Sequence, residues 1–341
     1  MCLTRKKVWF ADTILLLVAL IWGMNYVAQS IGADYLPAPV FNLFRYTLGT
    51  VFILPVSLYR HKRWERELNK FIKECRKRNI DPEAAIKAYE DTDDHWRMRV
   101  PPQANWMEWR LAIPGGILAG ICVAIGGLLQ QTALKTADAG TAGVISGLYV
   151  VIVPFLGLFF KDRLHAGNVI GSVIALVGLF LVSFKSAGSF GSGELMLIAS
   201  AIFFALHIII ISRVNPTCDS LKIAVLQNLV PVVISLLIIY FGHYQIIWEH
   251  LSAALPSLLY AGIGSTGIAF SLQVIAQDQA SPSHAAIIMS LEAVFAVIGG
   301  RIFLGERLSL RVYIGIILMI AAMLISQIAA IRQATGGGKK V

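Results

Sequence analysis

The chain has 341 residues, of which 57% are hydrophobic and 14% are charged, and its mean hydropathy is +0.70. Soluble domains are typically about 45–50% apolar and about 25% charged, so this composition excludes an ordinary soluble protein and indicates a membrane protein. The formal net charge of +9 does not indicate nucleic-acid binding, because the basic residues are grouped between long apolar segments.

The first apolar segment follows a basic start, as in a signal peptide. It continues past Ala28 without a small-x-small cleavage site, so we expect a retained first span. The four cysteines, Cys2, Cys75, Cys122 and Cys218, are scattered and include no C-x-x-C pair. The sequence therefore gives no support for a disulfide framework, a zinc site or another cofactor.

Ten segments are long and apolar enough to cross a membrane. A helix needs about 20 predominantly apolar residues to span about 30 Å of hydrocarbon. Segments of this kind lie near residues 9–31, 38–59, 111–134, 139–160, 166–185, 194–213, 221–241, 252–276, 282–304 and 309–331. We therefore predict an all-α membrane protein with ten transmembrane helices.

Most of the 29 Lys and Arg residues fall in segments that share one side of the membrane if the N-terminus is inside. Cytoplasmic loops of membrane proteins carry such an excess of basic residues. We therefore expect both termini in the cytoplasm of a cell with an inner membrane. The basic stretch 301–311 is the exception, since this orientation places it outside.

Residues 60–110 form the only long polar segment, with thirteen basic and ten acidic residues. The sequence RWERELNKFIKECRKRN has helical spacing, and DPEAAIKAYE starts with an Asp cap followed by Pro in the first turn. A solvated cytoplasmic insert lying against anionic lipid accounts for this composition. A regulatory or partner-binding role is the alternative, and no catalytic motif is visible in the segment.

Short matches indicate an internal repeat. FKDRL at 160–164 corresponds to LGERL at 304–308, and IWGMNYV at 21–27 to FFALHII at 203–209. Because each half would hold five spans, an odd number, the second half must lie inverted relative to the first. Inverted repeats are typical of secondary transporters, whose substrate site lies near the membrane midplane where the halves meet. The predicted division is 1–59 with 111–185 as the first repeat, 60–110 as the insert, 186–331 as the second repeat and 332–341 as a cytoplasmic tail.

Three stretches resemble a known family. IWGMNYVAQSIGADYLPAPVFNLFRYTLG resembles the opening of an EamA-type domain, ALKTADAGTAGVISGLYVVIVPFLGLFFKDRL its third to fifth spans, and SPSHAAIIMSLEAVFAVIGGRIFLGERLSL the second copy of the domain. The resemblance covers nearly all of the chain except 60–110. It implies the drug/metabolite transporter superfamily: ten helices in the inner membrane of a bacterium or archaeon, moving small metabolites. It implies no particular substrate and no shared binding residues.

Arg45 places a permanent charge inside the second predicted span. It follows Pro39 by six residues, or about 9 Å at 1.5 Å per residue. At that depth the side chain can snorkel to the membrane interface as an anchor. The alternative is a cavity-facing cation that attracts a substrate carboxylate or balances Glu292.

Glu292 lies in the middle of the ninth predicted span, where Ser290 is its only polar neighbour. Removal from water favours the neutral form of a carboxyl group unless a cation or several donors stabilise the charge. Ionisable groups within spans are functional candidates by default. We weigh two roles equally: a proton- or cation-binding group, and a hydrogen-bond acceptor that locks helices together.

Other polar side chains in the spans are candidates for lining a substrate cavity. His207 corresponds to Asn25 in the repeat and can titrate near neutral pH, although a packing histidine explains it as well. Trp22, Asn25 and Gln29 form one polar-aromatic stripe on the first span. The predicted substrate-binding residues are Trp22, Asn25, Arg45, Tyr149, His207, Gln227, Gln273 and Glu292. For Tyr149 and the glutamines, hydrogen bonding between helices is the competing explanation.

The chain contains no G-x-x-x-x-G-K-[ST], H-E-x-x-H or G-x-S-x-G motif. We therefore predict that it is not an ATP-driven pump or an enzyme but a secondary transporter of a small metabolite, with an amino acid or similar amphipathic solute as the favoured substrate. Protons are the expected coupling ion, the lipid bilayer is the expected environment, and either a monomer or a homodimer is compatible with the sequence. The alternatives are a drug or lipid exporter on the same scaffold, and a membrane sensor that acts through residues 60–110.

Overall fold

The computed structural model describes residues 5–81, 106–159, 166–183, 191–214, 219–305 and 309–336, and every regular element in these ranges is a helix. Eight helical segments are long and apolar enough to cross a membrane, which confirms an all-α, multi-pass membrane protein. Two further helices, Ala166–Leu181 and Leu310–Ser326, are apolar but shorter. They correspond to the spans predicted near 166–185 and 309–331.

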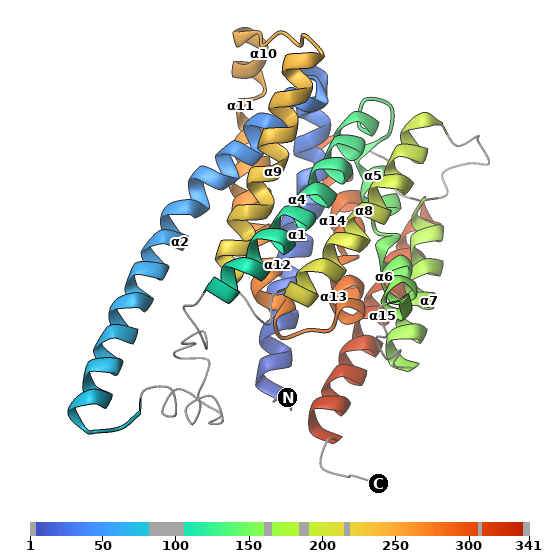
Figure 1. Ribbon diagram of the computed structural model, residues 1–341. Helices are drawn as coiled ribbons and strands as arrows, with labels where there is room; N and C mark the ends of the chain where they lie inside the picture. The colour runs from blue at the N-terminus through green and yellow to red at the C-terminus, as the bar shows by residue number, and fades with distance from the viewer. Residues whose placement is uncertain are drawn as a thin grey trace.

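The helices form one bundle, with the start of α1 and the end of α15 at the same end of it (Figure 1). The first half of the chain contains α1 (Arg5–Tyr35), α2 (Ala38–Lys77), α4 (Trp106–Ala133), α5 (Ala139–Ser146), α6 (Tyr149–Phe159) and α7 (Ala166–Ser183). The second half contains α8 (Ser192–Val214), α9 (Ser220–Phe241), α10 (Trp248–Ala253), α11 (Leu255–Leu259), the π-helix η2 (Tyr260–Ala269), α12 (Phe270–Gln277), α13 (Pro282–Met289), α14 (Glu292–Phe303) and α15 (Leu310–Gly336).

Two predicted spans, 139–160 and 282–304, are confirmed as apolar helical segments long enough to cross a membrane, and each is interrupted by a short turn near its middle. In the first, the Leu148 N–H bonds to the Ile145 carbonyl three residues back, over 3.1 Å. In the second, the Leu291 N–H bonds to the Ile288 carbonyl over the same distance. Such a short 3₁₀-like turn often marks a functional position within a helix. Here the two turns lead into α6 and α14, whose first residues are Tyr149 and Glu292.

The predicted span 252–276 is also irregular, because ten of its residues form the π-helix η2. π-Helical segments are rare and are frequently found at functional sites. Glycines let η2 approach α2 closely: a Cβ on Gly262 would lie 2.7 Å from the Leu48 Cβ and 3.0 Å from the Arg45 carbonyl oxygen. The close contact fixes η2 against the part of α2 that carries Arg45.

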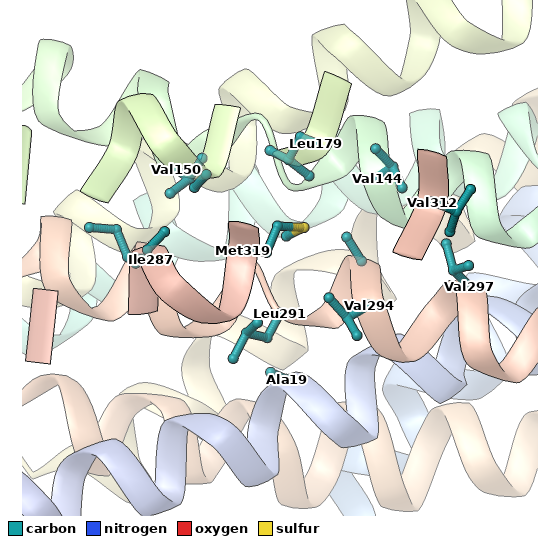
Figure 2. Close-up of a cluster of buried hydrophobic side chains, with 13 residues drawn as sticks. Ala19, Val144, Val150, Leu179, Ile287, Leu291, Val294, Val297, Val312 and Met319 are labelled. Carbon is teal, nitrogen blue, oxygen red and sulfur yellow. The ribbon is translucent and has the colours of Figure 1, made fainter. Parts of the chain in front are cut away.

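An apolar core holds the two halves of the chain together (Figure 2). It joins side chains of α5, α6 and α7 to side chains of α13, α14 and α15, with Ala19 of α1 at its edge. Because lipid tails are as apolar as the side chains, the hydrophobic effect does not drive helix association within a membrane, and helices associate through close packing at small residues instead. Gly178 of α7 illustrates this, since a Cβ there would lie 2.8 Å from the Gly315 carbonyl oxygen of α15.

The helix α2 continues far beyond the span predicted at 38–59. It has 40 residues, or about 60 Å at 1.5 Å per residue, twice the hydrocarbon thickness. Its second part projects away from the bundle (Figure 1), so the predicted helix in RWERELNKFIKECRKRN is confirmed up to Lys77. Residues 82–105, with most of the second helix predicted in the insert, lie outside the described residues.

An ion pair ties α2 to the start of α9. Arg60 donates to the Asp219 carboxylate over 2.7 Å, and Asp219 also caps α9 by accepting from the Leu221 and Lys222 N–H groups. Burial acts to raise the pKa of Asp219, but the Arg60 charge and these hydrogen bonds outweigh it, and the pKa lies below its usual value.

We expect this pair to make stability depend on acid pH. Because the pKa of Asp219 is lowered in the folded protein, its contribution is complete above the usual carboxyl pKa and is lost as pH falls through the lowered value. Asp219→Ala also removes a helix cap, which typically costs about 0.5–2 kcal/mol. Thermal unfolding in detergent at several pH values measures both effects. The variant should unfold at a lower temperature than the wild type near neutral pH, with a smaller difference in acid; an equal difference at every pH would contradict the assignment.

Candidate functional site

A polar pocket lies inside the bundle, and both halves of the chain contribute to it. It contains about 440 Å³ of space free of protein atoms, a volume that includes its open mouth. The side chains that line it are Trp22, Asn25, Tyr26, Arg45, Gln130, Tyr149, Phe204, His207, Ile208, Ser265, Gln273 and Glu292. They come from α1, α2, α4 and α6 in the first half and from α8, η2, α12 and α14 in the second.

Arg45 supplies a fixed positive charge to this pocket. Its side chain is only 4% exposed, and it donates through Nη1 to the Gln29 Oε1 over 2.6 Å and through Nε to the Thr266 Oγ1 over 3.4 Å. The guanidinium also lies 4.7 Å from the centre of the Tyr46 ring. The guanidinium thus lies inside the bundle, not at the lipid-facing surface that an interfacial anchor would occupy.

The Arg45 guanidinium has spare hydrogen-bonding capacity. A guanidinium carries five N–H donors, and the two bonds above engage two of them. Its recorded partners are neutral, and no ion pair of the described residues involves Arg45. A buried cation without a counter-charge is costly. A ligand carboxylate reaching this side of the pocket would find both charge complementarity and free donors.

Glu292 supplies the acidic group of the pocket. It begins α14, directly after the interruption of the ninth predicted span, and is buried. The Tyr26 hydroxyl donates to its Oε1 over 3.5 Å. Tyr149, at the start of α6, lies at the corresponding interruption of the other half. The two broken spans therefore present a carboxyl and a phenol to the same space.

His207 of α8 also lines the pocket. Its Nε2 lies 2.9 Å from the Gln227 Oε1, and its ring meets Phe270 edge-on at 5.7 Å between centroids. Trp22 packs against the other part of Phe270, at 5.1 Å. Gln227 does not line the pocket itself but stands behind His207 and fixes its orientation.

Several buried polar atoms of the pocket have no hydrogen-bond partner within the protein. Buried polar groups normally have such partners, but the Asn25 Oδ1, the Ser265 Oγ and both amide atoms of Gln273 have none. Leaving each such group unpaired costs about 1–3 kcal/mol. These atoms are available to form hydrogen bonds with a polar ligand in the pocket.

The structure brings seven of the eight predicted site residues to this pocket: Trp22, Asn25, Arg45, Tyr149, His207, Gln273 and Glu292. The eighth, Gln227, does not line the pocket but contacts His207, which does. The sequence prediction did not include Tyr26, Gln130, Phe204, Ile208 and Ser265. Tyr26 follows the predicted residue Asn25, and Phe204 lies one helical turn before the predicted residue His207, so the sequence contained a signal for both. Ser265 faces the pocket because of the π-helical twist of η2, and no sequence pattern indicated it.

Residues 95–184 and 191–327 match the EamA-like transporter family, and together they make up well over half of the chain. The chain belongs to the EamA-like transporter family. Membership assigns this protein to the transporters and not to the enzymes, in agreement with the resemblance seen in the sequence. It also accounts for the multi-pass helical bundle and implies a small-molecule substrate.

Relatives of this EamA-like protein carry names that describe transport or uptake. A protein of Archaeoglobus fulgidus named as an uncharacterized transporter is 26% identical over 93% of this chain and 85% of its own length. Proteins of Bacillus cereus and Bacillus anthracis, each named probable glucose uptake protein GlcU, are 26% identical over 63% of this chain and 78% of their own length. A solved crystal structure shares the fold, with a TM-score of 0.64 and 18% identity over 94% of this chain and 98% of that chain.

Proposed function

We propose that this protein is a secondary transporter that carries a small metabolite with a free carboxylate across the inner membrane, and that an amino acid is the favoured class. The observation that carries the proposal is the Arg45 guanidinium, buried at the pocket with only neutral hydrogen-bond partners. Glu292 adds an acidic group to the same pocket. An amino acid brings a carboxylate for the Arg45 guanidinium, and it brings an ammonium group whose N–H donors suit the unpaired oxygens of Asn25 and Gln273.

The proposed mechanism is alternating access by two inverted five-span halves, making ten transmembrane helices in all. Transporter sites of this type lie near the midplane between repeats and use interrupted helices. The matching interruptions before Tyr149 and Glu292 support this arrangement, as does a pocket lined from both halves. Rocking of one half against the other would expose the pocket to each side in turn.

The proposed orientation places both termini in the cytoplasm, following the excess of Lys and Arg on that side. The domain division predicted from the sequence, with residues 60–110 as a cytoplasmic insert between the second and third spans, is retained in this proposal. A proton is the proposed coupling ion, with Glu292 as the group that carries it in the pocket.

Glucose or a similar sugar is the second candidate substrate. The names of the two Bacillus relatives favour it, and a ring of hydroxyls could pair with Asn25, Ser265 and Gln273 while one face packs on Trp22. A neutral sugar, however, leaves the Arg45 charge without a partner. A lipid or hydrophobic-drug exporter fits less well, because such a ligand would leave every unpaired polar atom of the pocket unpaired.

Uptake by the purified full-length protein in proteoliposomes tests the proposal. The panel should contain amino acids, the amines formed from them by decarboxylation, glucose and an amphipathic drug. Each is tested with and without a proton gradient directed into the liposomes, with the outside more acidic. We expect saturable uptake of one or more amino acids, no uptake of the matching amines, and acceleration by the gradient. Uptake of glucose alone would replace the amino-acid assignment, and uptake of none of these would contradict the proposed function.

A further inference from the structure

A second buried polar cluster lies apart from the pocket and includes residues near the start of α1 and toward the end of α15, two segments that lie at the same end of the bundle (Figure 1). It links Asp12 of α1, Asn168 of α7, His284 of α13 and Ser326 of α15, and none of the four is more than 6% exposed. Its members therefore come from both halves of the chain. The proposed function gives this cluster no role.

The cluster is a continuous chain of hydrogen bonds centred on His284. The His284 Nε2 lies 2.7 Å from the Asp12 Oδ1, and the His284 Nδ1 lies 2.8 Å from the Ser326 Oγ. The Ser326 hydroxyl donates onward to the Asn168 Oδ1 over 3.0 Å. The second oxygen of Asp12, Oδ2, is buried and has no partner.

The hydrogen bonds of the cluster accommodate one proton more than a neutral imidazole carries. A hydroxyl has one hydrogen, so when the Ser326 hydroxyl donates to the Asn168 oxygen it is left to accept from the His284 Nδ1. With both ring nitrogens protonated, His284 donates to Ser326 through Nδ1 and to Asp12 through Nε2. With one proton fewer, the Asn168 amide turned and the Ser326 hydroxyl donating to Nδ1, a neutral His284 still donates to Asp12 through Nε2. The two states differ by one proton, and only the first leaves the pair neutral overall.

We propose that Asp12 and His284 together form a binding site for one proton, and that this proton holds α1 against α13 at this end of the transporter. With the proton bound, the pair is neutral overall and its short hydrogen bond joins the two halves. Loss of the proton leaves a net negative charge on the buried Asp12 carboxylate, one oxygen of which has no hydrogen-bond partner, and burying an uncompensated charge is costly. The contact then opens, and water can enter from this end.

The surroundings of the pair contain few competing charges. α7 and α15 face His284 with the neutral Asn168 and Ser326, while α6 and α8 contribute apolar residues, Leu156 and Ile209 among them, to the core cluster that also holds Ala285. Arg213 at the end of α8 and Asp278 before α13 are engaged in interactions of their own. Within the part of the chain that the structure describes, the proton is therefore shared by Asp12 and His284 alone.

Infrared difference spectra of the purified protein in lipid, recorded over a pH titration, test the site without any transported substrate. We expect a one-proton step that disappears both in Asp12→Asn and in His284→Gln, since the two groups share the proton. Asp138→Asn and His250→Gln, the same substitutions at exposed positions, should keep it. Ser326→Ala, which retains both titrating groups, should keep the step with a shifted midpoint. Survival of the step in Asp12→Asn or in His284→Gln would overturn the proposal.

The second measurement addresses opening, and this part rests on the proposed function. Uptake by the wild type should depend on the pH of the solution that faces this end of the bundle, and the midpoint of that dependence should equal the midpoint of the infrared step. Uptake by Asp12→Asn should show no pH dependence with that midpoint. Loss of the infrared step with unchanged pH dependence of uptake would overturn the role in opening. Failure of every substrate in the panel would contradict the proposed function and would leave the infrared result standing by itself.

Discussion

Arg45→Gln is expected to abolish specific uptake of carboxylate substrates while the protein still inserts and folds. The substitution removes the one Lys or Arg charge among the described residues that line the pocket and replaces it with a neutral amide. Hydrogen bonds to charged groups are worth about 1.5–3 kcal/mol, so substrate affinity should fall by about 10- to 100-fold or more. Substrate binding and initial uptake rates in proteoliposomes measure the change.

Two further variants make this result specific. Arg60→Gln is the same substitution on the same helix, but Arg60 lies outside the pocket and pairs with Asp219, so uptake should remain near the wild-type level. Arg45→Lys keeps the charge but not the planar fork that binds a carboxylate through two bonds, and should recover only part of the affinity. Normal uptake by Arg45→Gln would show that Arg45 is a structural charge.

Glu292→Gln is expected to remove the effect of a pH gradient on transport. The variant keeps the size and the oxygen that accepts from Tyr26 but cannot bind or release a proton. Exchange of labelled for unlabelled substrate, which needs no net proton movement, should persist, whereas accumulation driven by the gradient should be lost. The comparison of exchange with gradient-driven uptake in the same proteoliposomes measures both.

Glu249→Gln serves as the matched control, because Glu249 is exposed on α10, away from the pocket. It should show the same gradient dependence as the wild type. If Glu292→Gln also keeps that dependence, the proton does not travel on Glu292. If it loses exchange as well as accumulation, Glu292 binds the substrate and its role as the coupling group fails.

Much of the fold was predictable because hydropathy and span length are local properties of the sequence. A run such as 194–213 has to be a helix in hydrocarbon, whichever neighbours it acquires. The interruptions at Gly147–Leu148 and Ser290–Leu291 were not predictable, because Gly and other weak helix formers are common within membrane spans that remain helical. They are maintained by tertiary packing between α5, α6, α13 and α14, which no single window of the sequence contains.

The candidate site was predictable to the extent that burial of a polar residue in a span is costly wherever it occurs. That argument identifies Arg45 and Glu292 one at a time. It does not predict that they line the same pocket, because they are far apart in the sequence and on different helices. Asp12 and His284 were missed for a related reason. Both lie close to the ends of their spans, where polar side chains are common, and only the fold brings the two together.

The unbroken course of α2 has a mechanical consequence. Arg45 and Lys77 belong to one helix and are about 48 Å apart along its axis at 1.5 Å per residue. A long rigid rod amplifies a small rotation at one point into a large sweep at its far tip. We therefore expect any reorientation of the buried stretch around Arg45 to displace the charged residues at the far end of α2 by a larger distance.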